Sequence, residues 1–168
     1  MSFKIFALEN EIKIHTIIPH DEFPETFMNE LEKFIREKAY INNVTREERK
    51  ISFWAPPFRF AWNGWNLFNP VTRACMELKE HSYGFDLKYK FVFMEFFVYA
   101  ILFSLLALFP ALPSAGWKAG YLVLVWIIYF FNILWPKPRF EKYIETTVEK
   151  LDTAYLEKLK KLKGNAEG

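Results

Sequence analysis

The sequence predicts an α+β membrane protein with three parts. These are a small cytoplasmic domain of antiparallel sheet and helix (residues 1–90), a two-helix transmembrane hairpin (91–135), and a C-terminal amphipathic helix with its tail (136–168). Three observations support this class: two long apolar stretches in the second half, alternating apolar and polar residues in the first half, and a helical apolar stripe at the end.

The two apolar stretches decide the class. Residues 91–112 hold one charged residue, Glu95, and residues 119–135 hold none. A helix needs roughly 20 apolar residues to cross the hydrocarbon core of a bilayer. Neither stretch has a polar face, which favours membrane spans over a helical hairpin buried in a soluble core. Trp117 extends the second span toward the headgroups, where indoles concentrate.

The distribution of basic residues predicts the orientation of the hairpin. The outer flanks of the two spans contain Lys79, Lys88, Lys90, Lys137, Arg139, Lys142 and Lys150, whereas the connecting turn contains only Lys118. Lys and Arg are retained on the cytoplasmic side. We therefore expect a multi-pass protein of a bacterial-type inner (plasma) membrane, with both termini in the cytoplasm. The first residues do not form a secretory signal, so the internal hairpin must direct insertion.

Composition and spacing give no indication of an active site. The net charge of +2 is too small to indicate nucleic-acid binding. The lone cysteine, Cys75, excludes an internal disulfide and a Cys-rich metal site, and we expect it in the core. The three histidines lack zinc-site spacing, and the glycines are too far apart for a phosphate loop. We expect no catalytic, cofactor-binding or metal-binding residues, and no enzymatic activity.

Alternation in the first half predicts the elements of the cytoplasmic domain. Residues 3–8 and 12–18 are expected to form a hairpin that turns at residues 9–11. A helix is expected with Pro24 near its first turn and its end at Asn42 and Asn43, and a strand is expected at residues 49–55. The apolar face of this helix consists of Phe27, Leu31, Phe34, Ile35 and Ile41. Asn63 and Gly64, between aromatic runs, predict a second hairpin.

Two strands are expected before the first span. Residues 85–93 alternate so regularly that they require an antiparallel neighbour, which favours a strand over a helix for residues 71–80. Ala74, Met76 and Leu78 would then pair across from Leu87, Tyr89 and Phe91. The second strand leads directly into the first span, which would hold the sheet close to the bilayer.

Pro136 and Pro138 end the second span, and the amphipathic helix follows. Its apolar stripe consists of Phe140, Ile144, Val148, Leu151, Tyr155, Leu159 and Leu162. The mean spacing is about 3.67 residues, which is typical of a straight helix and not of a left-handed coiled coil. The stripe needs a cover, either the sheet, the membrane or a partner, which makes Leu151 and Tyr155 candidate interaction residues.

Four further residues are candidates for interaction. Glu95 lies either at the headgroup level or buried against a partner, and the interface is the favoured placement. Asn132, in the second span, can bond to a neighbouring helix or reach the interface. Trp62 and Trp65 are expected in the sheet core and on a surface at the lipid headgroups; the alternative, stacking on single-stranded bases, has only Arg59 nearby to support it.

These features predict a non-catalytic accessory or scaffold subunit of an inner-membrane complex. The layout of strands, a two-span anchor and an amphipathic helix is similar to that of small bacterial inner-membrane proteins, which implies a compartment and no activity. Two spans with almost no polar residues offer a solute no path, but they offer apolar faces to another integral membrane protein and to lipids. The alternative is a membrane-tethered sensory or regulatory module that binds a lipid headgroup or a small ligand. No nucleic-acid partner and no cofactor are expected.

Overall fold

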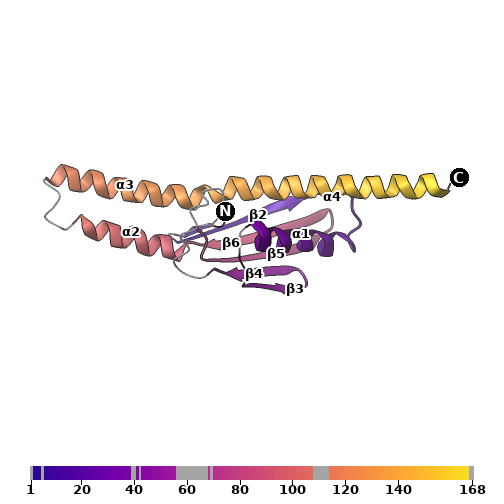
Figure 1. The fold of residues 1–168 in the computed structure, drawn as a ribbon, viewed down its shortest axis with the longest axis horizontal. Helices are drawn as coiled ribbons and strands as arrows, with labels where there is room; N and C mark the ends of the chain where they lie inside the picture. The colour runs from indigo at the N-terminus through magenta and orange to yellow at the C-terminus, as the bar shows by residue number, and fades with distance from the viewer. Residues whose placement is uncertain are drawn as a thin grey trace.

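The computed structural model describes residues 2–4, 6–38, 41, 43–55, 68, 70–107 and 114–166, and it confirms the α+β class (Figure 1). Six strands form one antiparallel sheet in the order β1-β2-β6-β5-β4-β3. The strands are β1 (Ser2–Lys4), β2 (Ala7–Ile14), β3 (Val44–Glu47), β4 (Lys50–Trp54), β5 (Arg73–His81) and β6 (Gly84–Val92). The helices are α1 (Phe23–Lys38), α2 (Met94–Leu106), α3 (Ala115–Leu134) and α4 (Pro136–Ala166).

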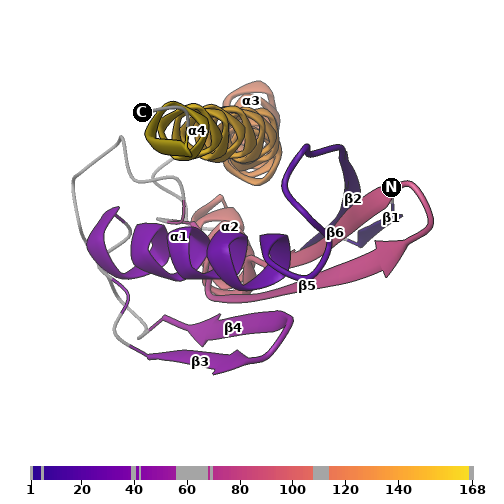
Figure 2. The ribbon, with the colours of Figure 1, turned by 90° about the vertical axis from the view of Figure 1, so that its right-hand side faces the viewer.

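The sheet curves around α1, and α4 lies over the same face (Figure 2). The helices α3 and α4 follow each other in nearly a straight line, and α2 runs beside α3 beyond one end of the sheet (Figure 1). None of the helices that the structure describes lies on the opposite face of the sheet, as both views show. We call it the open face.

The hairpin of β5 and β6 has the predicted register. Ala74 pairs with Phe91, Met76 with Tyr89 and Leu78 with Leu87, and all six side chains are buried. The strand prediction for residues 71–80 is thus confirmed. His81 pairs with Gly84, which has a φ of 147°. A Cβ at that position would lie 2.5 Å from the carbonyl oxygen of Ile14, so this close approach of β2 requires glycine.

The predicted turn at residues 9–11 is wrong. Lys4 pairs with Ala7, so the chain reverses before β2, and β2 continues through residues 9–11 and ends at Ile14. Glu9 and Glu11 point to the open face and pair with Lys90 at 2.5 Å and Lys88 at 3.2 Å. Asn10 points inward, where it has an acceptor on α4. Three consecutive polar residues resemble a turn in sequence, but each has a partner on a neighbouring element.

The helix α1 runs from Phe23 to Lys38, so Pro24 lies in its first turn as predicted, whereas Ile41, which was expected on its apolar face, lies beyond its end. The strand β3 was not predicted; it pairs with β4, and ion pairs join it to α1. Glu32 lies 2.8 Å from the Arg36 guanidinium and 3.3 Å from that of Arg46 on β3. The hydrogen bond from Arg36 is the largest of the contributions that hold the pKa of Glu32 below its usual value. These contacts attach the β3–β4 edge to α1.

The first apolar stretch begins inside the sheet. Phe91 and Val92 belong to β6, two residues past the expected domain boundary at 90, because the Phe91 ring fills the core. The helix α2 that follows has 13 residues, about 20 Å, and is shorter than a hydrocarbon core. By length and composition, one stretch of the described chain qualifies as a span, the α3–α4 helix from Ala115 to Lys163. The two-span hairpin is therefore not confirmed.

The first half of α4 supplies the core of the domain with three buried residues of the predicted stripe: Phe140, Ile144 and Val148. The Phe140 ring lies 4.9 Å from Tyr89 and 5.1 Å from Phe91 between centroids. Edge-to-face contacts of this kind add to the free energy of burying the rings. Leu159 and Leu162, in the same stripe, are exposed. The stripe therefore packs on the sheet at one end only.

We predict that Phe140→Ala lowers the free energy of unfolding by about 3–5 kcal/mol, because it removes a fully buried ring and leaves a cavity. Denaturation of the protein in a mild detergent, followed by near-UV circular dichroism, measures this loss. Leu162→Ala is the control on the same stripe; its side chain is exposed, and we expect a change within about 0.5 kcal/mol. Equal losses would contradict the packing of α4 on the sheet.

Candidate functional site

The helices α2 and α3 together present a continuous apolar surface. We call them the apolar helix pair. Twelve of their large apolar side chains are 44–59% exposed: Met94, Val98, Leu102, Phe103, Leu105, Leu106, Val123, Leu124, Ile127, Ile128, Phe131 and Leu134. Soluble proteins rarely expose contiguous apolar patches larger than a few hundred Å². Only 17% of the most apolar window of the α3–α4 helix is buried, so this is no core helix of a soluble domain. Lipid or another protein must cover it.

A groove of about 380 Å³ runs between the two helices. Its walls are almost entirely apolar and include Phe96 and Phe103 from α2 and Leu124 and Ile128 from α3. Ala100, which is buried between the helices, leaves room at the contact. The groove has the size and chemistry for an apolar side chain of a neighbouring helix or for an acyl chain.

The polar candidates of the two apolar stretches lie far apart along the chain. Glu95 is half-buried in the first turn of α2, and its backbone N–H donates to Thr72 Oγ1 at 3.4 Å, where the sheet meets the apolar helix pair. Asn132 donates from Nδ2 to the carbonyl oxygen of Ile128 at 2.8 Å, within its own helix. Its amide thus has an acceptor without a neighbouring helix. Trp62 and Trp65 lie outside the described residues.

The junction of α3 and α4 combines aromatic and basic side chains. The Arg139 guanidinium lies over the Trp135 ring, 4.7 Å from its centroid. Trp and Arg are residues of membrane interfaces, since an indole has an apolar body and a polar tip, and a long basic stem can lie along apolar surface. Where α3 ends, the apolar surface gives way to a helix with a polar face.

The other two candidate residues, on α4, pack against the core of the domain itself. Leu151 and Tyr155 are partly buried and pack against the core from α4. Between them, Asp152 accepts from Thr16 Oγ1 at 2.5 Å and from the backbone N–H of Ile17 at 3.3 Å. Beyond this point the exposed apolar residues are Leu156, Leu159 and Leu162, among Lys158, Lys160, Lys161 and Lys163. We call residues 156–163 the α4 tip; it extends past the sheet in Figure 1.

A polar cluster between α4 and the sheet was missed by the sequence analysis. Glu141 Oε1 accepts from Asn10 Nδ2 at 2.7 Å and from the Tyr89 hydroxyl at 3.1 Å. Burial is the main reason why the pKa of Tyr89 is raised, so its phenol stays a neutral donor. The sequence could have indicated this cluster, because the alternation of residues along the two strands places Asn10 and Tyr89 on the inward face. Polar atoms on an inward face require hydrogen-bond partners.

The open face carries charged side chains in cross-strand pairs. Cys75 lies there, half-exposed, and not in the core as predicted, because the inward positions of β5 are Ala74, Met76 and Leu78. The histidines are dispersed: His20 contacts Glu80 at 3.3 Å, and His81 contacts Asp86 at 3.4 Å. Within the described ranges, no group of three or more His, Cys, Asp and Glu could hold a metal ion.

We predict that Glu141→Ala lowers the free energy of unfolding by about 1–3 kcal/mol, because the buried amide of Asn10 and the hydroxyl of Tyr89 lose their acceptor. Glu145→Ala, one turn further along α4 at an exposed position, is the matched control, with an expected change within about 0.5 kcal/mol. Denaturation curves of both variants in the same detergent measure the difference. A Glu141→Ala protein as stable as the control would contradict the role of the cluster.

No family model, no curated protein and no solved structure matches this chain.

Proposed function

We propose that this chain is a non-catalytic accessory or scaffold subunit of an inner-membrane protein complex. The apolar helix pair crosses the bilayer twice, and the sheet, α1 and α4 stand in the cytoplasm. The single observation that carries the proposal is the exposed apolar surface of α2 and α3, which projects beyond one end of a folded domain (Figure 1). Lipid covers most of this surface, and the groove between the helices is available to another membrane protein.

Helix lengths and charges support two crossings. The 20 residues of α3 span about 30 Å, the thickness of a hydrocarbon core. The described part of α2 is shorter, but the sequence stays apolar through residue 112. Basic residues gather where the domain meets the apolar helix pair: Arg73, Lys88, Lys90, Lys137, Arg139 and Lys142. This distribution favours a cytoplasmic domain.

The α4 tip is the partner-binding part of the proposal. Because α4 continues the line of α3, its 31 residues form an arm of about 46 Å that points away from the membrane. The tip combines exposed leucines with four lysines and Glu157. A second copy lying parallel would bring like charges together, which is unfavourable. We therefore propose an acidic amphipathic helix of another subunit as the segment that binds the tip.

A second function has one observation in its favour. The open face holds a depression whose charged lining is basic, as a headgroup-binding sensory or regulatory module requires. This depression is the subject of the next subsection.

Labelling of single cysteines tests the two crossings. In a Cys75→Ser background, we expect Ser114→Cys to react with a membrane-impermeant maleimide from outside the cell. Thr153→Cys, exposed on α4, is expected to react only after permeabilisation. Reaction of both positions from the same side would contradict two crossings.

Co-purification of the partner subunit tests the arm. We predict that the double substitution Leu159→Asp and Leu162→Asp reduces retention of a stoichiometric partner at least about tenfold, because it places charges in an apolar contact. The protein itself should stay equally stable, since both side chains are exposed. Glu149→Lys, exposed on the same helix, is the control and should retain the partner. A lone monomer in mild detergent, with lipid only, would contradict the scaffold role.

A further inference from the structure

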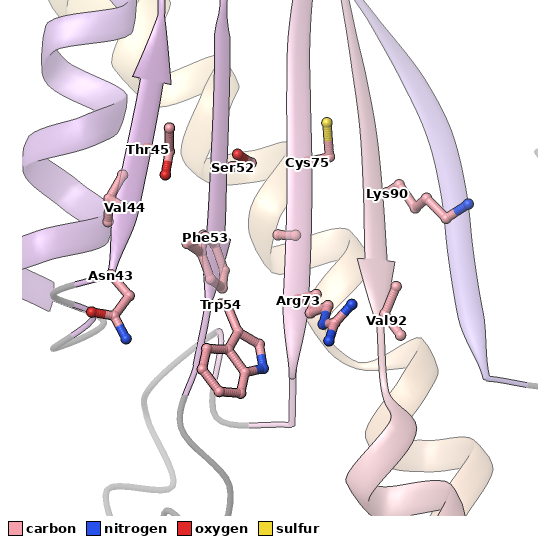
Figure 3. A pocket seen from close by; sticks show the side chains of 11 residues that line it. Asn43, Val44, Thr45, Ser52, Phe53, Trp54, Arg73, Cys75, Lys90 and Val92 are labelled. Carbon is pink, nitrogen blue, oxygen red and sulfur yellow. The ribbon is translucent and has the colours of Figure 1, made fainter.

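The open face of the sheet has a depression of about 760 Å³ over β3, β4, β5 and β6 (Figure 3). Arg73 and Lys90 are its charged lining residues, and none of the described residues that line it is a carboxylate. Asn43, Thr45 and Ser52 add amide and hydroxyl groups on the opposite side from Lys90. Acidic and basic residues alternate over the rest of the open face. The depression differs because its charged lining residues are all basic, which favours the binding of an anion.

Arg73 has no ion-pair partner within the described part of the chain, whereas four other bases of this face have one; Lys13 on β2 also lacks a partner but does not line the depression. The paired bases are Lys50 with Glu47 at 3.6 Å, Lys79 with Glu77 at 3.4 Å, Lys88 with Glu11 at 3.2 Å and Lys90 with Glu9 at 2.5 Å. The guanidinium of Arg73 presents five donors in a planar fork that fits the oxygens of a phosphate. Its charge is therefore available to a ligand.

The position of Arg73 relates the depression to the membrane. Its cross-strand partners are Val92 on β6 and Trp54 on β4, and α2 begins two residues after Val92. Figure 3 shows Arg73 and Trp54 at the end of the sheet where β6 leads into a helix. The Trp54 indole is 49% exposed, as is usual for a side chain that rests among lipid headgroups. This row of the sheet is the one nearest to the apolar helix pair.

We propose that the depression binds the phosphate group of an anionic phospholipid headgroup. Arg73 donates to the phosphate oxygens, and Trp54 lies against the glycerol region. This inference rests on the proposed crossing of α2 and α3, because only that placement brings the row of Val92, Arg73 and Trp54 to the level of the headgroups. The position of the depression next to the helices would not strengthen the binding of a soluble phosphate compound.

Lipid titration of the full-length protein in a mild non-ionic detergent tests the site. Native mass spectrometry counts bound phosphatidylglycerol and, in a second titration, phosphatidylcholine. We expect the wild type to prefer phosphatidylglycerol, and Arg73→Gln to weaken its binding about tenfold with little change for phosphatidylcholine, because a charge-assisted pair of hydrogen bonds is lost. Arg73→Lys keeps the charge without the fork and should lie between the two.

Lys79→Gln is the matched control. It removes a base from the same face and strand, at a position two rows from the depression, and should leave the binding unchanged. Trp54→Ala is a second variant of the site, at a half-exposed position, and should weaken binding in the same direction. Unchanged binding by both Arg73→Gln and Trp54→Ala, or equal weakening by Lys79→Gln, would overturn the site. Displacement of the lipid by an equal concentration of inorganic phosphate would overturn the lipid assignment.

The labelling experiment on Ser114→Cys and Thr153→Cys separates this proposal from the proposed function. Its outcome does not depend on Arg73, which lies outside the apolar helix pair. Two crossings without an effect of Arg73→Gln would refute the headgroup site and leave the anchor intact. Labelling of both positions from the same side, together with weaker lipid binding by Arg73→Gln, would refute the two crossings. It would leave an anion site on a protein that binds lipid in detergent.

Discussion

The packing of Phe140 against Tyr89 and Phe91 is the contact on which the rest of the structure depends. It attaches the first turns of α4 to the central strand of the sheet, and α4 is in line with α3. Movement of this contact would therefore change the angle between the apolar helix pair and the whole domain. The hydrogen bonds to Glu141, the next residue along α4, add direction to an otherwise non-directional apolar contact.

The two uncovered surfaces of the molecule have opposite chemistry. The open face of the sheet carries four ion pairs, three between neighbouring strands and one within β5, so water can solvate it and no partner is required. Such pairs contribute little stability each, but they keep an uncovered sheet face polar. The apolar helix pair cannot remain in water, and its cover must be lipid or protein. This contrast is the physical basis for placing the membrane at one end of the domain.

The rod formed by α3 and α4 links the two environments. The helix α3 is apolar on nearly every side, and the helix α4 is amphipathic. Along α4 the apolar stripe is first covered by the sheet, at Ile144 and Val148, and then uncovered at the tip, at Leu159 and Leu162. A stripe that continues past its own domain is what a scaffold needs to bind a second subunit at a fixed distance from the bilayer.

Much of the fold could be predicted because local patterns decide it: alternation predicted β5 and β6 with their register, and a spacing near 3.6 residues predicted α4. Part of the candidate site could also be predicted, since Leu151 and Tyr155 lie on the apolar stripe of α4. The sequence did not predict which residues of this stripe the domain itself covers. Three features depend on segments that are distant in sequence: the path of β2 through Asn10, the position of Cys75 on the open face and the lack of an ion-pair partner for Arg73.

Sequence alone therefore determined periodicity and the apolar character of α2 and α3, which are properties of neighbouring residues. Only the tertiary structure decided which polar groups meet and which face of the sheet stays uncovered, because those depend on contacts between segments up to 136 positions apart.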